Sequence, residues 1–148
     1  MALLTGTEVS APPKRLVAGV IAGGSLAIMD ATIVVPTVGQ IASDFNAGSE
    51  ATLVVSIYLI ATSVTMPLWG RLLDVRGERT AYLAAMAFFA VGTVLALFAP
   101  SLPVLIAARL IQGIGGGGLS PLGQAILAGR CTPVQRARLQ IWYTIFYG

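Results

Sequence analysis

Long, almost uninterrupted apolar segments dominate this sequence, and short polar segments separate them. A helix needs about 17 to 25 mostly apolar residues to cross ~30 Å of hydrocarbon. Helices are expected rather than barrel strands, because the segments are long and do not alternate between apolar and polar positions. The pattern therefore predicts an all-α, polytopic membrane protein with four spanning helices and the start of a fifth, at residues 16–38, 52–69, 81–99, 104–128 and 139–148.

The polar connections support this division. Ser49 lies where it can cap the second helix, and Pro103 falls in the first turn of the fourth, where proline is tolerated. Residues 1–15 are expected to form a cytoplasmic tail, and residues 16–148 a partial transmembrane bundle. A cleaved signal peptide is the alternative for the first apolar segment, but that segment is long and three more spans follow it.

The distribution of lysine and arginine predicts the orientation. These residues occur in the N-terminal tail and in the second and fourth connections, whereas the first and third connections have none. Cytoplasmic connections carry the excess of basic residues in membrane proteins. We therefore expect a cytoplasmic N-terminus and a multi-pass protein of the plasma membrane. The basic residues of these three segments are Lys14, Arg15, Arg71, Arg76, Arg79, Arg130, Arg136 and Arg138.

Composition strengthens this interpretation. The chain is 56% hydrophobic and only 10% charged, with a mean hydropathy of +0.85, whereas soluble domains carry about 25% charged residues. One cysteine, Cys131, and no histidine argue against a disulfide framework or a metal cluster. No nucleophile or pair of carboxylates converges, so an enzyme is not expected. The lipid bilayer is the predicted partner, and nothing in the pattern predicts nucleic-acid binding.

Two charged residues, Asp30 and Arg109, fall inside predicted spans. An ionisable side chain near the bilayer centre costs roughly 2.5–3.5 kcal/mol on insertion scales, so it normally faces a cavity or a partner. At 1.5 Å per residue, both lie ~21 Å from the cytoplasmic side of a ~30 Å core. Two interpretations remain open: a polar site in a water-accessible cavity, where Asp30 gains and loses a proton, or a structural ion pair between two helices.

The fourth predicted helix contains a glycine-rich stretch at residues 112–124. Gly113, Gly115 and Gly118 match the G-x-G-x-x-G spacing, but a nucleotide site needs a preceding strand, and none is expected here. Gly113 and Gly117 also have the small-xxx-small spacing that lets neighbouring helices approach closely. Close helix packing through Gly113, Gly115 and Gly117 is therefore predicted, with bending of the helix as a second possibility.

Three stretches carry more specific patterns. Around the second connection, the pattern G-x-x-x-D-x-x-G-x-R is formed by Gly70, Asp74, Gly77 and Arg79. The fourth helix has R-x-x-Q-G-x-G, formed by Arg109, Gln112, Gly113 and Gly115. The first helix has an aspartate followed by T-I-V, formed by Asp30, Thr32, Ile33 and Val34. The glycines of the first pattern are also expected to permit a tight turn between helices.

Together these stretches resemble the motifs of the major facilitator superfamily, in particular its drug:proton antiporters with fourteen helices. The resemblance implies the N-terminal part of a bundle that exports small, amphipathic compounds by alternating access. It implies protons as the coupling ion and no other cofactor. By the same resemblance, Asp30, Arg109 and Gln112 belong to the proton-coupling region and cavity. Gly70 and Asp74 would belong to a cytoplasmic gate that meets a second, missing C-terminal bundle.

The chain departs from the family pattern at three positions. Val35 stands where the first-helix motif usually has asparagine. Glu78 and Arg130 reverse the usual signs of a base in the second connection and an acid at the end of the fourth helix. We therefore predict a swapped salt bridge between Glu78 and Arg130. The alternative is two solvated charges, which would contribute little to stability.

A major facilitator protein needs two bundles around a central site, and this chain provides helices of only one. We therefore expect these 148 residues to be the N-terminal portion of a transporter and not to transport alone. A sugar or metabolite carrier is the alternative within transport. A small non-transporting scaffold protein is the alternative outside it, but it gives no reason for Asp30 and Arg109 inside the membrane.

Overall fold

The computed structural model describes residues 14–130, 137 and 141 of the chain, and its described part is all-helical. A short 3-10 helix, η1, precedes α2, and each long helix, alone or with η1, is apolar and long enough to cross a membrane. The predicted fifth segment at residues 139–148 lies outside the described residues, apart from position 141. The all-α membrane fold is confirmed by α1 (Lys14–Asp44), η1 (Gly48–Ala51), α2 (Thr52–Arg76), α3 (Glu78–Leu97) and α4 (Leu102–Arg130).

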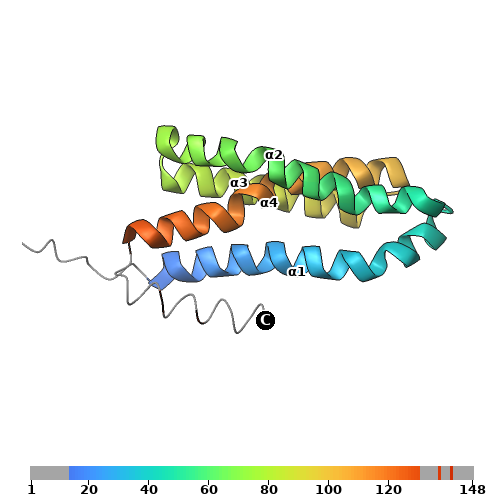
Figure 1. The fold of residues 1–148 in the computed structure, drawn as a ribbon, viewed down its shortest axis with the longest axis horizontal. Helices are drawn as coiled ribbons and strands as arrows, with labels where there is room; N and C mark the ends of the chain where they lie inside the picture. Colours follow the sequence, from blue (N-terminus) through green and yellow to red (C-terminus); the bar gives the residue numbers. More distant parts are fainter. Residues whose placement is uncertain (1–13, 131–136, 138–140, 142–148) are drawn as a thin grey trace, which may run out of the picture.

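The four helices run alternately up and down (Figure 1). The start of α1, the α2–α3 turn and the end of α4 lie at one end of the molecule, and the other two turns lie at the opposite end. Arg71, Arg76 and Arg79 are exposed near the α2–α3 turn. The gathering of the basic segments at one end supports the predicted orientation, in which this end faces the cytoplasm.

The turn between α2 and α3 is a single residue, Gly77, with φ 83° and ψ 163°. This backbone conformation is accessible almost only to glycine, because a Cβ atom would collide with the chain. The prediction that Gly70 also belongs to the turn is wrong, since Gly70 lies inside α2. The apolar pattern places the second span correctly, but the helix continues through the charged residues to Arg76.

The predicted cap at Ser49 is also wrong. The N-cap of α2 is Ala51, and no side chain bonds to the helix N-terminus there. The backbone is already helical in η1, so the Ser49 carbonyl instead accepts a hydrogen bond from the Thr52 hydroxyl at 2.6 Å. Pro103, in contrast, is the second residue of α4, where its missing N–H costs nothing.

The core lies along α4, which packs mainly on α3 and α2 and less on α1. The outer faces of α2 and α3 expose large apolar side chains such as Leu68, Val91 and Leu97. A membrane protein can leave such surfaces uncovered because lipid tails solvate them. Buried side chains of the larger core cluster include Val20, Tyr58, Trp69, Tyr82, Phe89, Leu119, Leu122 and Ile126.

Glycines allow this packing of α4. A Cβ atom at Gly115 would collide with the backbone of Phe89 and Ala85 on α3. At Gly113 it would meet the Tyr58 carbonyl oxygen on α2 at 2.7 Å, and at Gly117 the Thr62 carbonyl oxygen at 2.6 Å. All three predicted packing glycines therefore face a neighbouring backbone, and none has room for a side chain.

Candidate functional site

The two charges predicted inside the membrane meet in the structure. Arg109 on α4 donates a hydrogen bond from one guanidinium nitrogen to Asp30 Oδ2 on α1, at 2.6 Å. The Arg109 side chain is 10% exposed and that of Asp30 is 20% exposed. The carboxylate is therefore the more accessible partner, while the arginine is held among the helices.

Arg109 does not depend on Asp30 alone. The same guanidinium nitrogen donates to Gln112 Oε1 at 2.9 Å, one helical turn further along α4. Additional hydrogen bonds of this kind are what allow a buried ion pair to offset the loss of water. Arg109 Nε is buried and has no hydrogen-bond partner among the described residues, so one donor of the guanidinium remains unused.

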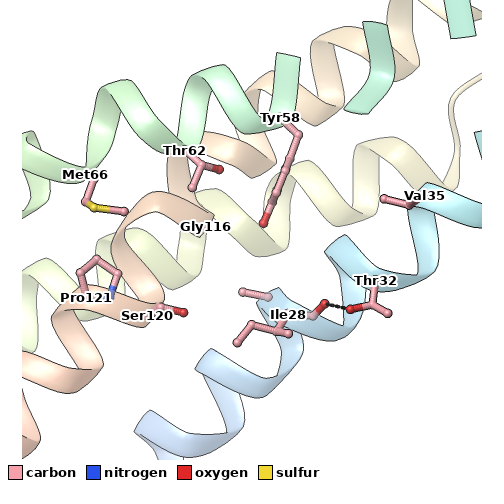
Figure 2. Close-up of a pocket in the computed structure, with 10 residues that line it drawn as sticks. Ile28, Thr32, Val35, Tyr58, Thr62, Met66, Gly116, Ser120 and Pro121 are labelled. Atoms are coloured by element: carbon pink, nitrogen blue, oxygen red, sulfur yellow. Dashed lines mark hydrogen bonds between the residues drawn. The ribbon is translucent and has the colours of Figure 1, made fainter. Parts of the chain in front are cut away.

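A cavity of about 450 Å³ lies between α1, α2 and α4 (Figure 2). In Figure 2, Tyr58 extends from α2 with its hydroxyl toward α1, and Met66 lies opposite Pro121 of α4. The cavity is lined by Ala27, Ile28, Thr32, Val35, Tyr58, Thr62, Met66, Gly116, Ser120 and Pro121.

The lining is apolar with a few hydroxyl groups. The hydroxyls belong to Thr32, Tyr58, Thr62 and Ser120, and none of the lining residues carries a charge. Asp30 is not one of the lining residues, but it lies on α1 between the lining residues Ile28 and Thr32, so the charged pair is close to the cavity wall. Such a surface suits an apolar body with a few polar groups. Within the described residues, no three metal-ligating side chains gather.

Polar side chains of α2 fasten this wall to α4. Thr62 donates its hydroxyl to the Gly113 carbonyl at 3.2 Å. The Thr65 hydroxyl lies 2.7 Å from the Ala61 carbonyl of its own helix and 3.3 Å from the Ile114 carbonyl of α4, with donor geometry to both. Trp69 Nε1 donates to the same Ile114 carbonyl at 2.7 Å. These bonds hold α2 against the glycine-rich part of α4, which positions Tyr58 and Thr62 at the cavity.

The residues of the predicted gate lie at the end of the molecule that holds the α2–α3 turn. Asp74 and Arg79 are exposed, on α2 and α3, and a Cβ atom at Gly70 would meet nothing within 4 Å. A Cβ atom at Gly129 would lie 3.8 Å from Glu78 Oε1, so this carboxylate is beside the end of α4.

The adjacent residue on α4 is Arg130, whose side chain lies outside the described residues. The Glu78–Arg130 salt bridge therefore stays a prediction.

A further polar contact joins α3 to α1 near the same end. The Tyr82 hydroxyl lies 3.3 Å from the Gly19 carbonyl oxygen and 3.2 Å from that of Val20, with donor geometry to both. Gly23 leaves space for the hydroxyl, because a Cβ atom there would collide with it. Neither this contact nor the residues of the cavity lining were predicted from the sequence, and the predicted cavity residues Asp30, Arg109 and Gln112 are not part of that lining. The i, i+4 spacing of Tyr58 and Thr62 on one helix face was the available signal.

Comparison with known proteins shows to which protein family this helical chain belongs. The chain matches the Major Facilitator Superfamily over residues 20–148. It therefore belongs to that superfamily of membrane transporters and not to a class of enzymes, as the sequence motifs predicted. No solved structure matches it significantly.

Several curated relatives are drug and amino-acid transporters. Multidrug resistance protein 3 of Bacillus subtilis is 32% identical over 97% of this chain, which corresponds to 28% of the relative. Vacuolar basic amino acid transporter 1 of Saccharomyces cerevisiae is 32% identical over 85% of this chain and 22% of its own length. Multidrug resistance protein fnx1 of Schizosaccharomyces pombe is 40% identical over 70% of this chain and 20% of its own length. The chain thus spans about a quarter of these relatives.

Proposed function

We propose that the transporter containing this chain couples proton entry to the export of small amphipathic compounds across the plasma membrane. In this proposal the chain supplies one wall of the transport cavity and the proton-coupling pair. The observation that carries it is the placement of Asp30, which is partly exposed, lies on α1 between the cavity residues Ile28 and Thr32, and is bonded to the more deeply buried Arg109.

The chemistry of the pair suits proton exchange. When Asp30 takes up a proton, it no longer balances the charge of Arg109, which keeps its bond to Gln112. The net charge beside the cavity then increases by one. A proton and a cationic substrate would therefore disfavour each other's binding, which is the linkage that an antiporter needs.

The cavity supports the choice of substrate class. Its apolar lining and scattered hydroxyls can accommodate the apolar part of a compound without demanding a fixed set of hydrogen bonds. The similarity to proteins named multidrug resistance protein points the same way. A second helical bundle would close the other side of the cavity, with Gly70 and Asp74 at the cytoplasmic contact between the bundles.

The proposal is tested by ethidium efflux from cells or vesicles that contain the full-length transporter, under an imposed pH gradient. Asp30→Asn should reduce efflux by more than about tenfold, because the neutral amide cannot exchange a proton and leaves Arg109 uncompensated. Asp44→Asn is the matched control, since Asp44 is an exposed acid at the end of the same helix. Unchanged efflux in Asp30→Asn would contradict the proposal. The 148-residue chain alone should not transport ethidium.

A second candidate function is the transport of basic amino acids. It is favoured by the relative named vacuolar basic amino acid transporter 1 and by the hydroxyl groups of the cavity. Arginine flux in the same vesicles separates the two candidates. Proton-dependent arginine flux without ethidium efflux would replace the first proposal by the second, and the vacuolar membrane would then be the expected location.

A further inference from the structure

The hydrogen-bond network of Arg109 continues beyond the cavity into α3. Gln112 Nε2 donates to the Thr93 hydroxyl oxygen at 2.9 Å, and Thr93 donates its own proton to the Phe89 carbonyl at 2.8 Å. Gln112 is only 1% exposed, so water does not compete for its amide. A single chain of bonds thus connects the backbone of α3 to the carboxylate on α1.

The chemistry of the donors determines the direction of every hydrogen bond in this series. An arginine can only donate, so the oxygen of the Gln112 amide must face Arg109. The amide nitrogen must then face Thr93, whose oxygen accepts because its proton is used on the Phe89 carbonyl. If the amide turned over, its NH₂ group would face the guanidinium, and two donors would oppose each other.

We propose that Thr93 is a positioning residue: by holding the Gln112 amide in one orientation, it aims Arg109 at Asp30. This proposal rests on the proposed function, because it concerns the same ion pair. The geometry of the Arg109–Asp30 pair, however, does not depend on which substrate the transporter carries. Thr93 itself lies on α3, away from the cavity lining, and acts only through Gln112.

The packing of α3 on α4 supports this role. Gly92, the neighbour of Thr93, has no side chain where a Cβ atom would collide with the Gln112 backbone nitrogen. The two helices therefore approach closely enough for a short threonine side chain to reach the amide. Among the described residues, the titratable and charged groups that face Asp30 from the other helices are Arg109 of α4 and Tyr58 of α2. Thr93 is uncharged, so its contribution is one of orientation.

The first test compares Thr93→Val and Thr93→Ser in the full-length transporter. Valine keeps the branched shape but removes the oxygen, whereas serine keeps the hydroxyl. We expect ethidium efflux to fall between about threefold and tenfold in Thr93→Val, the usual effect of leaving a buried amide unsatisfied, and Thr93→Ser to stay within about twofold of wild type. Thr37→Val is the control, because the Thr37 hydroxyl donates only to carbonyls of its own helix.

A role through Gln112 has a further consequence. If Thr93 acts only by orienting that amide, Thr93→Val should have no additional effect in a Gln112→Ala background. The pH profile of efflux should also be displaced in Thr93→Val and restored in Thr93→Ser, which a loss of packing alone would not produce. Additive effects of Thr93→Val and Gln112→Ala would overturn the proposal.

A measurement without substrate separates this proposal from the proposed function. Infrared spectroscopy can follow protonation of the Asp30 carboxyl group with pH, with the band assigned by its loss in Asp30→Asn. The titration should differ between wild type and Thr93→Val, and Thr93→Ala repeats the test if the valine variant is not recovered from membranes. Identical titrations, including no titration in either protein, would overturn the role of Thr93. Absence of ethidium transport by wild type would contradict only the proposed function.

Discussion

Helix α4 contacts its neighbours in two different ways. Against α2 and α3 it presents Gly113, Gly115 and Gly117, so that backbones touch backbones along this stretch. Against α1 the contact is smaller, Gly123 meets a side chain there (that of Val20), and Figure 1 shows α1 set apart along one side of the other three helices. The Arg109–Asp30 ion pair joins α4 to α1 at this smaller interface.

The difference has a physical basis in the membrane. Lipid tails are as apolar as leucine, so helices associate there through close packing and hydrogen bonds and not through hydrophobic burial. The glycine contacts make α2, α3 and α4 a tightly packed unit. Helix α1 depends more on polar contacts, including Tyr82 to Gly19 and Val20, and these can be changed by protonation or by a ligand. The Arg109–Asp30 ion pair thus lies at the smaller of the two interfaces.

The largest expected effect is at the glycine interface. Gly115→Leu should prevent recovery of folded protein, because the side chain would collide with backbone atoms of Phe89 and Ala85, at a cost of about 3 kcal/mol or more. Gly39→Leu is the control, since a Cβ atom there meets nothing within 4 Å. Monodisperse protein extracted in mild detergent is the measurement. Normal yields of Gly115→Leu would show that the three helices are not tightly packed.

The next effect tests the polar interface. Arg109→Met alone should destabilise the fold by about 2 to 3 kcal/mol, because it leaves Asp30 unpaired between helices. The double variant Arg109→Met with Asp30→Leu should recover to within about 1 kcal/mol of wild type, since apolar pairs can replace buried ion pairs. Thermal unfolding in detergent measures both. If the double variant is less stable than Arg109→Met, the ion pair stabilises the fold by more than the cost of burying its two charges.

A smaller effect is expected at the α3–α1 contact. Tyr82→Phe removes the hydroxyl that bonds to the Gly19 and Val20 carbonyls, at about 1 kcal/mol. Hydrogen exchange should become faster in the first half of α1 and stay unchanged in the glycine-rich part of α4. Equal acceleration in both helices would argue that α1 is not the more weakly held element.

The smallest effect concerns the predicted salt bridge at the ends of α3 and α4. Glu78→Arg and Arg130→Glu should each lower stability by about 0.2 to 1 kcal/mol, and the double charge swap should restore it. The melting temperatures of the four proteins complete this cycle. If the double variant is no more stable than the single ones, the two charges are solvated separately.

The sequence predicted the parts of the structure that depend on periodicity and on the cost of charge in lipid. The spans of α2 to α4 followed from apolar length, and Asp30 and Arg109 were matched in depth by counting the helical rise from the expected helix ends. The helix ends were less predictable: Ser49 does not cap α2, and Gly70 does not turn the chain, since in both cases helical backbone extends further than the apolar pattern.

Contacts between helices were harder to predict. Thr93 and Tyr82 look like other polar residues within apolar segments. Nothing in the surrounding sequence indicates that Thr93 contacts Gln112, 19 positions away, or that Tyr82 contacts Val20, 62 positions away. Their importance depends on the rotation of α3 against α4 and α1, which tertiary packing decides. The glycine motif indicated that helices approach closely, but not which side chains that approach brings together.

The single-residue turn at Gly77 has a mechanical consequence. One residue extends the chain by at most ~3.6 Å, so the adjoining ends of α2 and α3 cannot slide past each other by more than a fraction of a helical turn. Any force that pulls on the Gly70–Asp74 end of α2 is therefore transmitted to α3 as an axial displacement. Because α3 carries Thr93, which bonds to Gln112, an axial displacement of this end of α2 would be passed along a continuous helix toward the buried ion pair.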